Sequence, residues 1–312
     1  MKIVRTVNIA LAVVLAVLLG GAFYLLGRSS VPERSDYAID RAGLERAASA
    51  LPGALPVRVN HVKIAEATMP RAALFSGFDF SPHAMVHGAY QVVYADGSYA
   101  LIDSGFGRQV FEQMAARGEA EYDAAAFDAL TRALPGARVV VMTHEHLDHI
   151  QGLAEVDDAK AMAAVAFVST AQYQNPETAE LLPPNLMAAL HPVHYEGAHA
   201  IAPGIAVLAA PGHTPGSQLV YVHPANGPAW LFIGDVAWHM DGIRDLAYRP
   251  RLVTDLLLGE DRRAVMAQYR TLHGMLGDPS LRIVSSHDLD QLEALQAEGA
   301  IGEGLEAAQA AN

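Results

Sequence analysis

The stretch THEHLDHIQG, residues 143–152, follows four apolar residues and carries three histidines and two carboxylates within six positions. His144 and His146 are two apart at the end of a predicted strand, so their side chains face the same side. Asp148 and His149 come where the chain is expected to turn into a helix, and both can point back at the same place. Four ligand-type side chains are more than one tetrahedral zinc ion normally takes from so short a segment. The stretch therefore predicts a metal site with ligands for more than one ion.

Three further predicted strands end in the same kind of side chain. AVLAAPGHTPG carries His213, WLFIGD ends at Asp235 and RIVSSHD carries His287. The carboxyl ends of strands gather at one edge of an open α/β sheet, where sites commonly form. We therefore predict two metal ions, with Asp235 as a carboxylate able to bridge them. The first ion would take His144, His146 and His213, and the second would take Asp148, His149 and His287.

Other polar residues near these motifs leave their roles open. Glu145 alternates away from the histidines beside it, which indicates a supporting position around the ligands or a place on the surface. His83 and His87 are four apart near the start of the domain and could line a pocket. A Pro-rich insertion contains His191, His194 and His199. For each of these five histidines, a solvated or packed role is the simpler interpretation.

The composition excludes several classes of function. Lys and Arg number 21 against 34 Asp and Glu, and the resulting net charge of -13 repels nucleic-acid phosphates. We therefore expect no nucleic-acid partner. The sequence contains no cysteine, which excludes a disulfide framework, a thiolate zinc site and a thiol nucleophile. Any metal must be held by His, Asp or Glu.

The N-terminal segment differs from the rest of the chain. Residues 7–26 are apolar over 20 positions apart from Asn8, and a helix of that length matches a hydrocarbon core of about 30 Å. Lys2 and Arg5 favour a cytoplasmic N-terminus, which would put the following domain outside the cytoplasm, in the periplasm of a Gram-negative cell. We predict a single-pass membrane anchor over 1–28. The alternative is a signal peptide whose cleavage would release a secreted protein.

The remaining chain divides into a linker, a large domain and a tail. Residues 29–55 mix Pro and charge with an amphipathic stretch over 40–51, which predicts a linker with one short helix. From 56 to 290, strand-like and helix-like patterns alternate and a hairpin surrounds 95–97, which is typical of an α/β fold with mixed sheets. The Ala- and Glu-rich segment 291–312 is predicted to be a helix that frays into a disordered end.

The motifs resemble those of the metallo-β-lactamase-fold hydrolases. The resemblance covers residues 57–290 and rests on H-x-H-x-D-H at 144–149, GHTPGS at 212–217, GD at 234–235 and SHD at 286–288. It implies an αβ/βα four-layer sandwich of two mixed sheets with the metals at one edge, preceded in this chain by the N-terminal helix. It also implies that Asp103, in LIDSG, supports the metal loop from behind the ligands.

Within this superfamily, HTPGSQ and IVSSHD are similar to motifs of N-acyl-homoserine lactonases. Those enzymes commonly place a tyrosine three residues after the bridging Asp to contact the substrate carbonyl, and this chain has Trp238 there. An indole N–H donates a hydrogen bond but does not act as a phenol. Trp238, His239 and Tyr195 are the candidates for substrate contacts. The apolar insertion 179–195 is the candidate wall for an acyl chain.

The expected reaction is hydrolysis of an ester or lactone, with an acyl-homoserine lactone as the first candidate. Two divalent cations would activate a bridging hydroxide that attacks the carbonyl, with zinc expected first and iron, manganese or cobalt as alternatives. Asp148 would orient this hydroxide and pass its proton to the leaving group. An amphipathic small molecule suits a membrane-bound enzyme. The alternatives are a β-lactamase or thioesterase of the same fold, or a non-catalytic membrane-tethered metal-binding protein.

Overall fold

Two β-sheets form the centre of the computed structural model, which describes residues 2–27 and 29–306. The first sheet has the order β12-β1-β2-β3-β5-β6, with β4 paired to β1, and the second has the order β11-β10-β9-β8-β7. The strands of the first sheet are β1 (Pro56–Pro70), β2 (Pro82–Tyr94), β3 (Tyr99–Ile102), β4 (Ala120–Tyr122), β5 (Val140–Val141), β6 (Ala166–Phe167) and β12 (Gly302–Glu303). Those of the second are β7 (Ala198–Ala202), β8 (Ile205–Ala209), β9 (Gln218–Val222), β10 (Ala229–Phe232) and β11 (Leu281–Val284).

Both sheets are mixed, as the sequence predicts. In the first, β1, β2 and β3 are antiparallel neighbours, whereas β3, β5 and β6 run parallel. In the second, β10 is antiparallel to β9 and parallel to β11. Val92 and Ile102 from the first sheet pack between the sheets with Val220 and Phe232 from the second. This shared apolar layer holds the two sheets face to face.

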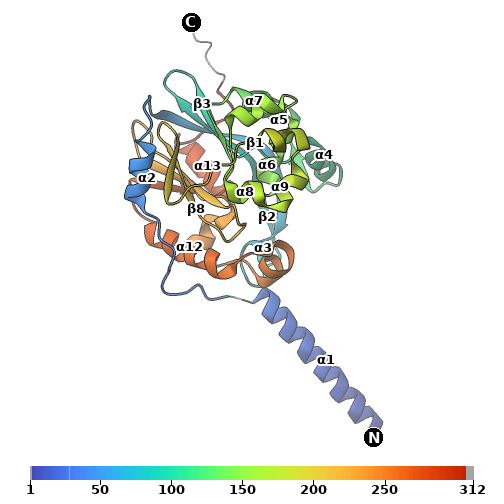
Figure 1. Ribbon diagram of the computed structural model, residues 1–312. Coiled ribbons are helices and arrows are strands. Elements are labelled where there is room, and N and C mark those ends of the chain that lie inside the picture. The colour runs from blue at the N-terminus through green and yellow to red at the C-terminus, as the bar shows by residue number, and fades with distance from the viewer. Residues whose placement is uncertain (1, 28, 307–312) are drawn as a thin grey trace.

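Helices cover the outer face of each sheet. On the first sheet lie α4 (Arg108–Ala116), α5 (Ala124–Ala133), α7 (Ala159–Val165), α9 (Pro176–Leu181) and α10 (Pro184–Ala189). On the second lie α2 (Arg41–Ala48), α11 (Met240–Arg244) and α12 (Arg262–Met275). Figure 1 shows α2 and α12 on one flank of the sheets and α4, α5 and α7 on the other. The four-layer αβ/βα sandwich is therefore confirmed.

Short helices occupy the connections between these elements. They are α3 (Arg71–Leu74), α6 (Leu147–Ile150), α8 (Thr170–Gln174), η1 (Leu134–Gly136), η2 (Gln151–Glu155), η3 (Gly234–Val236) and the π-helix η4 (Leu252–Leu258). Two of them, α6 and η3, are the next elements after β5 and β10 and carry ligand-type side chains at the same edge of the fold. A third, η4, leads into α12.

The stretch expected as a linker is packed on the domain. Ser30 forms a β-bridge with Ala247, and the Ser35 hydroxyl donates to the Ala267 carbonyl oxygen at 2.7 Å. In α2, Leu44 and Ala48 are buried against the outer face of the second sheet. These apolar positions on one face of an amphipathic helix explain why the segment docks. The chain therefore joins the domain within a few residues of the N-terminal helix.

The C-terminal segment forms the predicted helix, but this helix and the residues after it pack on the domain. Helix α13 (Leu289–Ala297) buries Leu292, and Ile301 beyond it is 2% exposed. Gly302 of β12 then pairs in parallel with Asn60 of β1. The Ala- and Glu-rich composition conceals these apolar side chains, which complete the layer between the sheets. The predicted disordered end falls largely on residues 307–312, which lie outside the described residues.

The N-terminal segment forms α1 (Lys2–Leu26), which projects away from the body on the side of α3 (Figure 1). Its apolar part, Asn8–Leu26, has 19 residues and is not buried against the domain. At 1.5 Å per residue this part is about 28 Å long, close to the hydrocarbon thickness of a bilayer. Length and composition fit either a membrane span or a signal sequence.

Candidate metal centre

Three histidines predicted to share one ion lie together. The Nδ1 atom of His146 is 3.1 Å from Nε2 of His144 and 2.9 Å from Nε2 of His213. Two nitrogens bound to one zinc ion at about 2.0–2.1 Å with tetrahedral angles lie about 3.3 Å apart. The loop after β5 and the loop after β8 thus present a set of nitrogens at nearly ligating distances.

The second predicted set forms beside the first. Asp148 Oδ2 is 3.3 Å from His287 Nε2 and 3.5 Å from His149 Nε2. Asp235 Oδ1 is 3.1 Å and 3.4 Å from the same two nitrogens. Asp148 and His149 come from α6, whereas Asp235 and His287 follow β10 and β11 of the other sheet. Both sheets contribute, so the set exists only when they are packed together.

Asp235 faces both sets. Its Oδ1 atom belongs to the second set, while its Oδ2 atom lies 3.5 Å from His213 Nε2 and 3.8 Å from His144 Nε2. The side chain is buried, with 5% of the residue exposed. One carboxylate therefore spans the space between the two sets, as expected for a bridging ligand.

The polar atoms of the second set fit a bound cation. His149 Nε2 and Asp235 Oδ1 are buried and have no hydrogen-bond partner. Buried polar atoms are nearly always partnered, because an unpartnered one loses its hydration without compensation. A divalent cation between these atoms would satisfy both. The donor set of nitrogens and carboxylate oxygens suits zinc, iron, manganese or cobalt.

Each of three histidines is oriented by a partner on its other nitrogen. His149 Nδ1 lies 2.9 Å from Asp103 Oδ2, and His287 Nδ1 lies 2.9 Å from the Val86 carbonyl oxygen. His213 Nδ1 lies 2.6 Å from Glu260 Oε1. These acceptors hold the proton on Nδ1, so each Nε2 presents a lone pair to the site. Asp103 lies behind the ligands, as the resemblance implied.

Glu260 was not found by the sequence interpretation. It is fully buried at its side chain, where it also pairs with Arg249 and accepts a hydrogen bond from the Tyr248 hydroxyl. No local motif distinguishes this glutamate in LLLGED. The sequence offers only a general rule for finding it, which is that a ligating histidine usually donates its other N–H to an acceptor. That rule predicts a partner without saying which residue it is.

The two sets differ in charge. Burial, together with neighbouring histidines, lowers the pKa of His146 to about 4 and that of His144 well below its usual range. In the second set burial works in the same direction, but the carboxylates of Asp235 and Asp148 prevail and raise the pKa of His287 to about 10. The two carboxylates thus favour positive charge beside them. A bound cation would supply this charge, and without one the protonated ring of His287 does so.

Glu145 is buried and joins two loops. Its Oε1 atom accepts hydrogen bonds from Asn175 Nδ2 at 2.7 Å and from the Gly216 backbone N–H at 3.0 Å. Its Oε2 atom accepts a bond from the Thr214 hydroxyl at 2.7 Å. Glu145 therefore has the supporting position that the sequence left open, and not the position on the surface. The carboxylate ties the HEHLDH loop to the GHTPGS loop.

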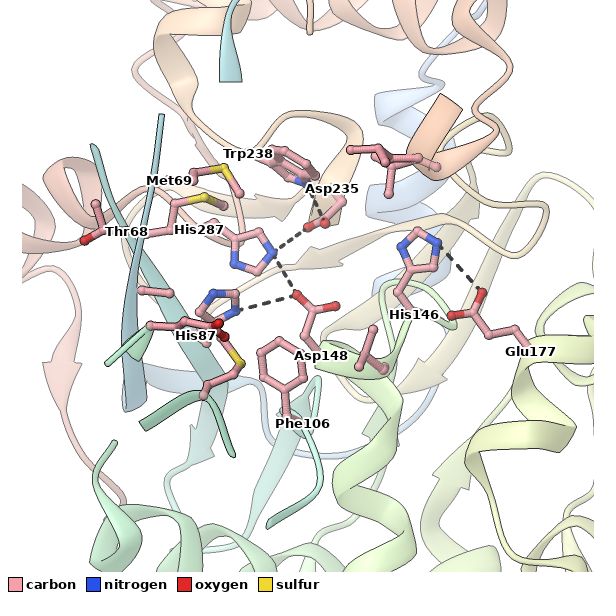
Figure 2. A pocket seen from close by; sticks show the side chains of 17 residues that line it. Thr68, Met69, His87, Phe106, His146, Asp148, Glu177, Asp235, Trp238 and His287 are labelled. Carbon is pink, nitrogen blue, oxygen red and sulfur yellow. Dashed lines mark hydrogen bonds and ion pairs between the residues drawn. The ribbon is translucent and has the colours of Figure 1, made fainter. Parts of the chain in front are cut away.

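A cavity of about 600 Å³ lies over the second set (Figure 2). Asp148, Asp235 and His287 are on its floor. Its remaining wall is mostly apolar and comprises Ala67, Thr68, Met69, Met85, Phe106, Met114, Leu147, Leu257 and Leu258, with Glu119, His146 and Glu177 among the polar members. Such a pocket, apolar with a few convergent polar groups, is typical of a small-molecule site.

Trp238 lines this cavity, but its indole N–H is not directed at open space. Nε1 donates to Asp235 Oδ2 at 2.7 Å, and the Arg249 guanidinium stacks 4.8 Å from the ring centroid. The residue at the usual tyrosine position thus contacts the bridging carboxylate (Figure 2). It shapes the pocket and holds Asp235 at the same time.

Two predicted substrate contacts and the predicted wall lie elsewhere. The Tyr195 hydroxyl donates to Gln218 Oε1 at 2.6 Å, and His239 caps α11 and packs against His83; neither lines the cavity. The insertion 179–195 does not line it either. Its side chains Leu182 and Leu186 are buried in the core under the outer helices. An apolar run satisfies a core as well as a pocket, and the sequence does not distinguish the two.

His87, whose role the sequence left open, does line the cavity. The residue is 8% exposed, its Nδ1 atom lies 3.6 Å from Asp148 Oδ2, and its ring centroid is 4.6 Å from that of His287. It comes from β2, where three consecutive residues, Met85, Val86 and His87, are buried. His87 is therefore a pocket residue beside the second set.

The match to known sequences covers this whole region. A sequence model described as the metallo-beta-lactamase superfamily matches residues 86–287, which include every member of both sets. The chain belongs to the metallo-β-lactamase superfamily. This result confirms the resemblance carried by HEHLDH, GHTPGS and SHD.

Curated relatives within the metallo-β-lactamase superfamily are N-acyl homoserine lactonases. One from Bacillus cereus is 26% identical over 106 residues, which are 34% of this chain and 41% of the relative. Another, from Bacillus sp, is 30% identical over 95 residues, 30% of this chain and 36% of the relative. The chain thus spans about two fifths of the length of the curated relatives it matches. These relatives agree with the lactonase-like branch indicated by the motifs.

Solved lactonase structures of this superfamily share the fold. A quorum-quenching N-acyl homoserine lactone lactonase superposes with a TM-score of 0.60 at 15% identity, covering 77% of this chain and 95% of that one. An N-acyl homoserine lactone hydrolase with N-hexanoyl-L-homoserine at its catalytic metal centre gives 0.59 at 15% identity, with 78% and 97% covered. At this level of identity the likeness shows the fold.

Proposed function

We propose that this protein is a membrane-anchored, dinuclear metal-dependent hydrolase of lactones or esters, with N-acyl homoserine lactones as the first substrate class. The observation that carries the proposal is the double set of ligand-type side chains that share Asp235. The buried, unpartnered atoms His149 Nε2 and Asp235 Oδ1 are the second support, because a cation between them would partner both.

The two sets would each hold one divalent cation, most suitably zinc. His144, His146 and His213 would bind the first, Asp148, His149 and His287 the second, and Asp235 both. When bound, such a pair of cations supplies an activated water as nucleophile and polarises the substrate carbonyl. The three orienting acceptors, Asp103, Glu260 and the Val86 carbonyl, keep the histidine lone pairs directed at the site.

Asp148 is the proposed proton carrier. It lies on the floor of the cavity with its side chain 14% exposed, so it can reach a bound substrate. Its carboxylate would accept the proton of the attacking water and pass it to the leaving oxygen. Trp238 would hold Asp235 Oδ2 through its N–H. It would not contact the substrate carbonyl as the phenol of the usual tyrosine does.

The cavity wall favours a neutral, apolar substrate. Met69, Met85, Phe106 and Met114 offer flexible apolar surface suited to an acyl chain. Among the described residues that line the cavity there is no Lys or Arg, whereas Glu119 and Glu177 are present. A β-lactam or a glutathione thioester carries a carboxylate that would meet no Lys or Arg side chain here. The similarity to curated lactonases supports the same choice.

The membrane anchor is part of the proposal. The 19 apolar residues of Asn8–Leu26 are long enough to cross a bilayer, and Lys2 and Arg5 precede them in the sequence. The positive-inside rule then puts the catalytic domain outside the cytoplasm. Mass spectrometry of the protein purified from membranes tests this directly. An intact N-terminal segment is expected, and a mature chain that begins after residue 26 would establish a cleaved signal peptide instead.

The activity is tested on the full-length chain in detergent or vesicles, loaded with zinc. Substrates are butanoyl and decanoyl homoserine lactones, nitrocefin, a thioester and a bis-aryl phosphodiester, with metal content measured for each preparation. We expect lactone turnover that a chelator abolishes. Asp148→Asn should lower kcat by at least about 100-fold, the range of general acid–base catalysis. Asp157→Asn, at an exposed carboxylate, is the matched control.

Two results would refute this assignment. The first is a zinc-loaded protein that turns over none of the five substrates, which would leave a metal-binding protein without catalysis. The second is an Asp148→Asn variant as active as Asp157→Asn, which would remove Asp148 from the reaction. Faster turnover of nitrocefin or the thioester than of either lactone would change the substrate class alone.

A further inference from the structure

Exposed apolar side chains gather in one region of the domain. Outside α1, the described residues include seven large apolar side chains that are exposed, and five of them come from two segments. One segment is the loop after α3 and the other is η4. We call these five side chains the apolar rim: Phe78, Phe80, Leu252, Leu256 and Leu257. Leu257, Leu256 and Phe80 are 72%, 63% and 60% exposed, values unusual for such residues on a soluble surface.

The two segments lie beside each other and beside the end of α1. The Ser76 backbone N–H donates to the Tyr248 carbonyl oxygen at 2.9 Å, which joins the loop after α3 to the segment that leads into η4. The Arg251 guanidinium, at the start of η4, stacks 4.9 Å from the ring centroid of Tyr24 in the last turns of α1. The apolar rim therefore lies beside the place where α1 meets the domain.

The connection from α1 to the domain is short. Leu26 ends the apolar part of α1, and Ser30 is already paired with Ala247. Four residue steps reach at most about 14 Å when fully extended. If α1 spans a bilayer, the surface around Ala247 is held within that distance of the hydrocarbon boundary. The domain has no long tether that would let it move away.

The aromatic residues of α1 indicate the depth of this surface. Phe23 and Tyr24 are 69% and 61% exposed near the end of the apolar stretch. Tyrosine is enriched at the level of the lipid headgroups, because its ring is apolar and its hydroxyl is wet. Contact of Arg251 with Tyr24 sets the start of η4 at this level. Leu256 and Leu257, about one turn further on, are then within reach of the acyl boundary.

The mouth of the cavity lies in the same surface. Leu257 is both a rim side chain and part of the cavity wall, and Leu258 and Met69 line the wall next to it. Met69 is at the end of β1 that leads to α3, on the side from which α1 projects (Figure 1). Leu257 thus joins the wall of the cavity to the rim.

We propose that the apolar rim docks on the surface of the lipid bilayer, so that the cavity opens against the membrane and takes acyl-chain substrates directly from it. The inference rests on the proposed function, because it requires α1 to be a membrane anchor. The occupant of the rim is the bilayer itself. The adjacent span, the short connection and the interfacial Tyr24 all favour lipid over a second protein.

The absence of cysteine makes the proposal directly testable. Phe80→Cys and Leu256→Cys, each in the full-length chain, are labelled with an environment-sensitive fluorophore. The proteins are reconstituted in vesicles of phosphatidylethanolamine and phosphatidylglycerol, with and without nitroxide-labelled acyl chains. Val57→Cys is the matched control, since Val57 is 48% exposed but lies at the opposite end of β1 from α3. Val17→Cys, in the middle of α1, reports on the anchor.

We expect nitroxide lipids to quench labels at 80 and 256 at least twice as strongly as the label at 57. Quenching at 17 without quenching at 80 and 256 would keep the anchor and overturn the docking of the rim. An unquenched label at position 17 would refute the anchor. If the labels at positions 80 and 256 were also unquenched, the docking of the rim would be overturned as well. Cross-linking between two labelled chains at 256, without quenching, would assign the rim to a second copy.

Turnover provides a second readout. Neither Phe80 nor Leu256 lines the cavity, so Phe80→Asp combined with Leu256→Asp should leave kcat/KM for butanoyl homoserine lactone in solution unchanged. Hydrolysis of decanoyl homoserine lactone supplied in vesicles should fall at least fivefold, and Val57→Asp should not change it. Equal rates for the double variant and the wild type on the vesicle substrate would overturn delivery from the membrane. A wild type inactive on both lactones would instead refute the proposed activity, while the quenching result still decides the docking.

Discussion

The floor and the mouth of the cavity are built on opposite principles. At the floor and directly beneath it, seven ligand-type residues come from both sheets, and His149, His213 and His287 each have a fixed partner on the nitrogen that faces away. At the mouth, Leu257 of the cavity wall is 72% exposed, and its neighbour Leu256, outside the wall, is 63% exposed. The outer nitrogens of the floor histidines find their partners within the chain, whereas the exposed apolar side chains of the mouth present a surface that another apolar surface could cover.

The difference arises because polar interactions are directional and apolar contacts are not. A buried nitrogen or carboxylate requires a partner at a defined distance and angle, so its neighbours are also determined. Apolar contact requires only area, so a wall can be built from any apolar segment that the fold brings there. Substitutions on the floor should therefore act on metal binding and turnover. Substitutions at the mouth should act on which substrate is preferred.

The largest effect is expected from the support of the floor. Glu260→Gln keeps the shape of the side chain but weakens the acceptor for His213 Nδ1–H. Loss of such an outer partner typically lowers metal affinity about 10- to 100-fold. Competition with a chelator for the bound metal measures the change, and Glu298→Gln, at an exposed ion pair, is the control. Unchanged affinity, with only a lower thermal stability, would mean that Glu260 serves Arg249 rather than the metal site.

A smaller effect is expected at the mouth. Leu258→Ala shortens the apolar wall without touching a ligand, so turnover of butanoyl homoserine lactone should persist. The preference for the decanoyl over the butanoyl substrate, as a ratio of kcat/KM values, should fall about tenfold, the effect of a lost hydrocarbon contact. Leu181→Ala in α9 is the matched control from the insertion. If Leu181→Ala shifted the preference and Leu258→Ala did not, the acyl chain would lie against the insertion after all.

The smallest effect on turnover is expected at His61, a buried histidine that is not part of either set. Burial, with some help from Lys63, lowers the pKa of His61 to about 3. The unfolded chain, with a pKa of about 6.5, takes up a proton first as the pH falls. The stability contribution is therefore full above pH 6.5 and is lost progressively between pH 6.5 and 3.

His61→Phe should remove this dependence while keeping the aromatic contact with Tyr90. Near pH 5 the wild type should have lost about 2 kcal/mol of unfolding free energy through His61, and the variant should not have lost it. Denaturant unfolding at pH 8 and pH 5 measures both proteins. Identical pH dependence would show that His61 is hydrated or paired in solution. Lactone turnover at pH 8 should be the same for both, in contrast to the floor variants.

The sequence grouped most clearly the residues whose chemistry is rare in a protein interior. His144, His146 and Asp148 were found because charged and imidazole side chains at the end of an apolar strand have few structural explanations. The same reasoning found His213, Asp235 and His287, and the structure brings all of them into two adjacent sets. The α/β class followed from alternating patterns, which depend on the period of each element alone.

The interpretation failed where a residue looks like many others. Leu182 and Leu186 in the insertion carry the same side chain as Leu257 and Leu258, yet the first two are in the core and the last two line the cavity. Glu260 and His87 lie far along the chain from the motifs they serve. His239 was chosen as the neighbour of Trp238 and Tyr195 for its place in the insertion, and the fold uses both in other contacts.

By itself, the sequence determined the superfamily, the alternation of strands and helices, the ligand types and the apolar N-terminal helix, because each of these depends on local spacing and composition. Only the tertiary structure decided which acceptor orients each histidine, which apolar segments form the cavity wall and where α1 lies relative to the cavity. Those features depend on contacts between segments distant in the chain. Two packed sheets and a short connection after Leu26 bring such segments together, and no local pattern records which ones will meet.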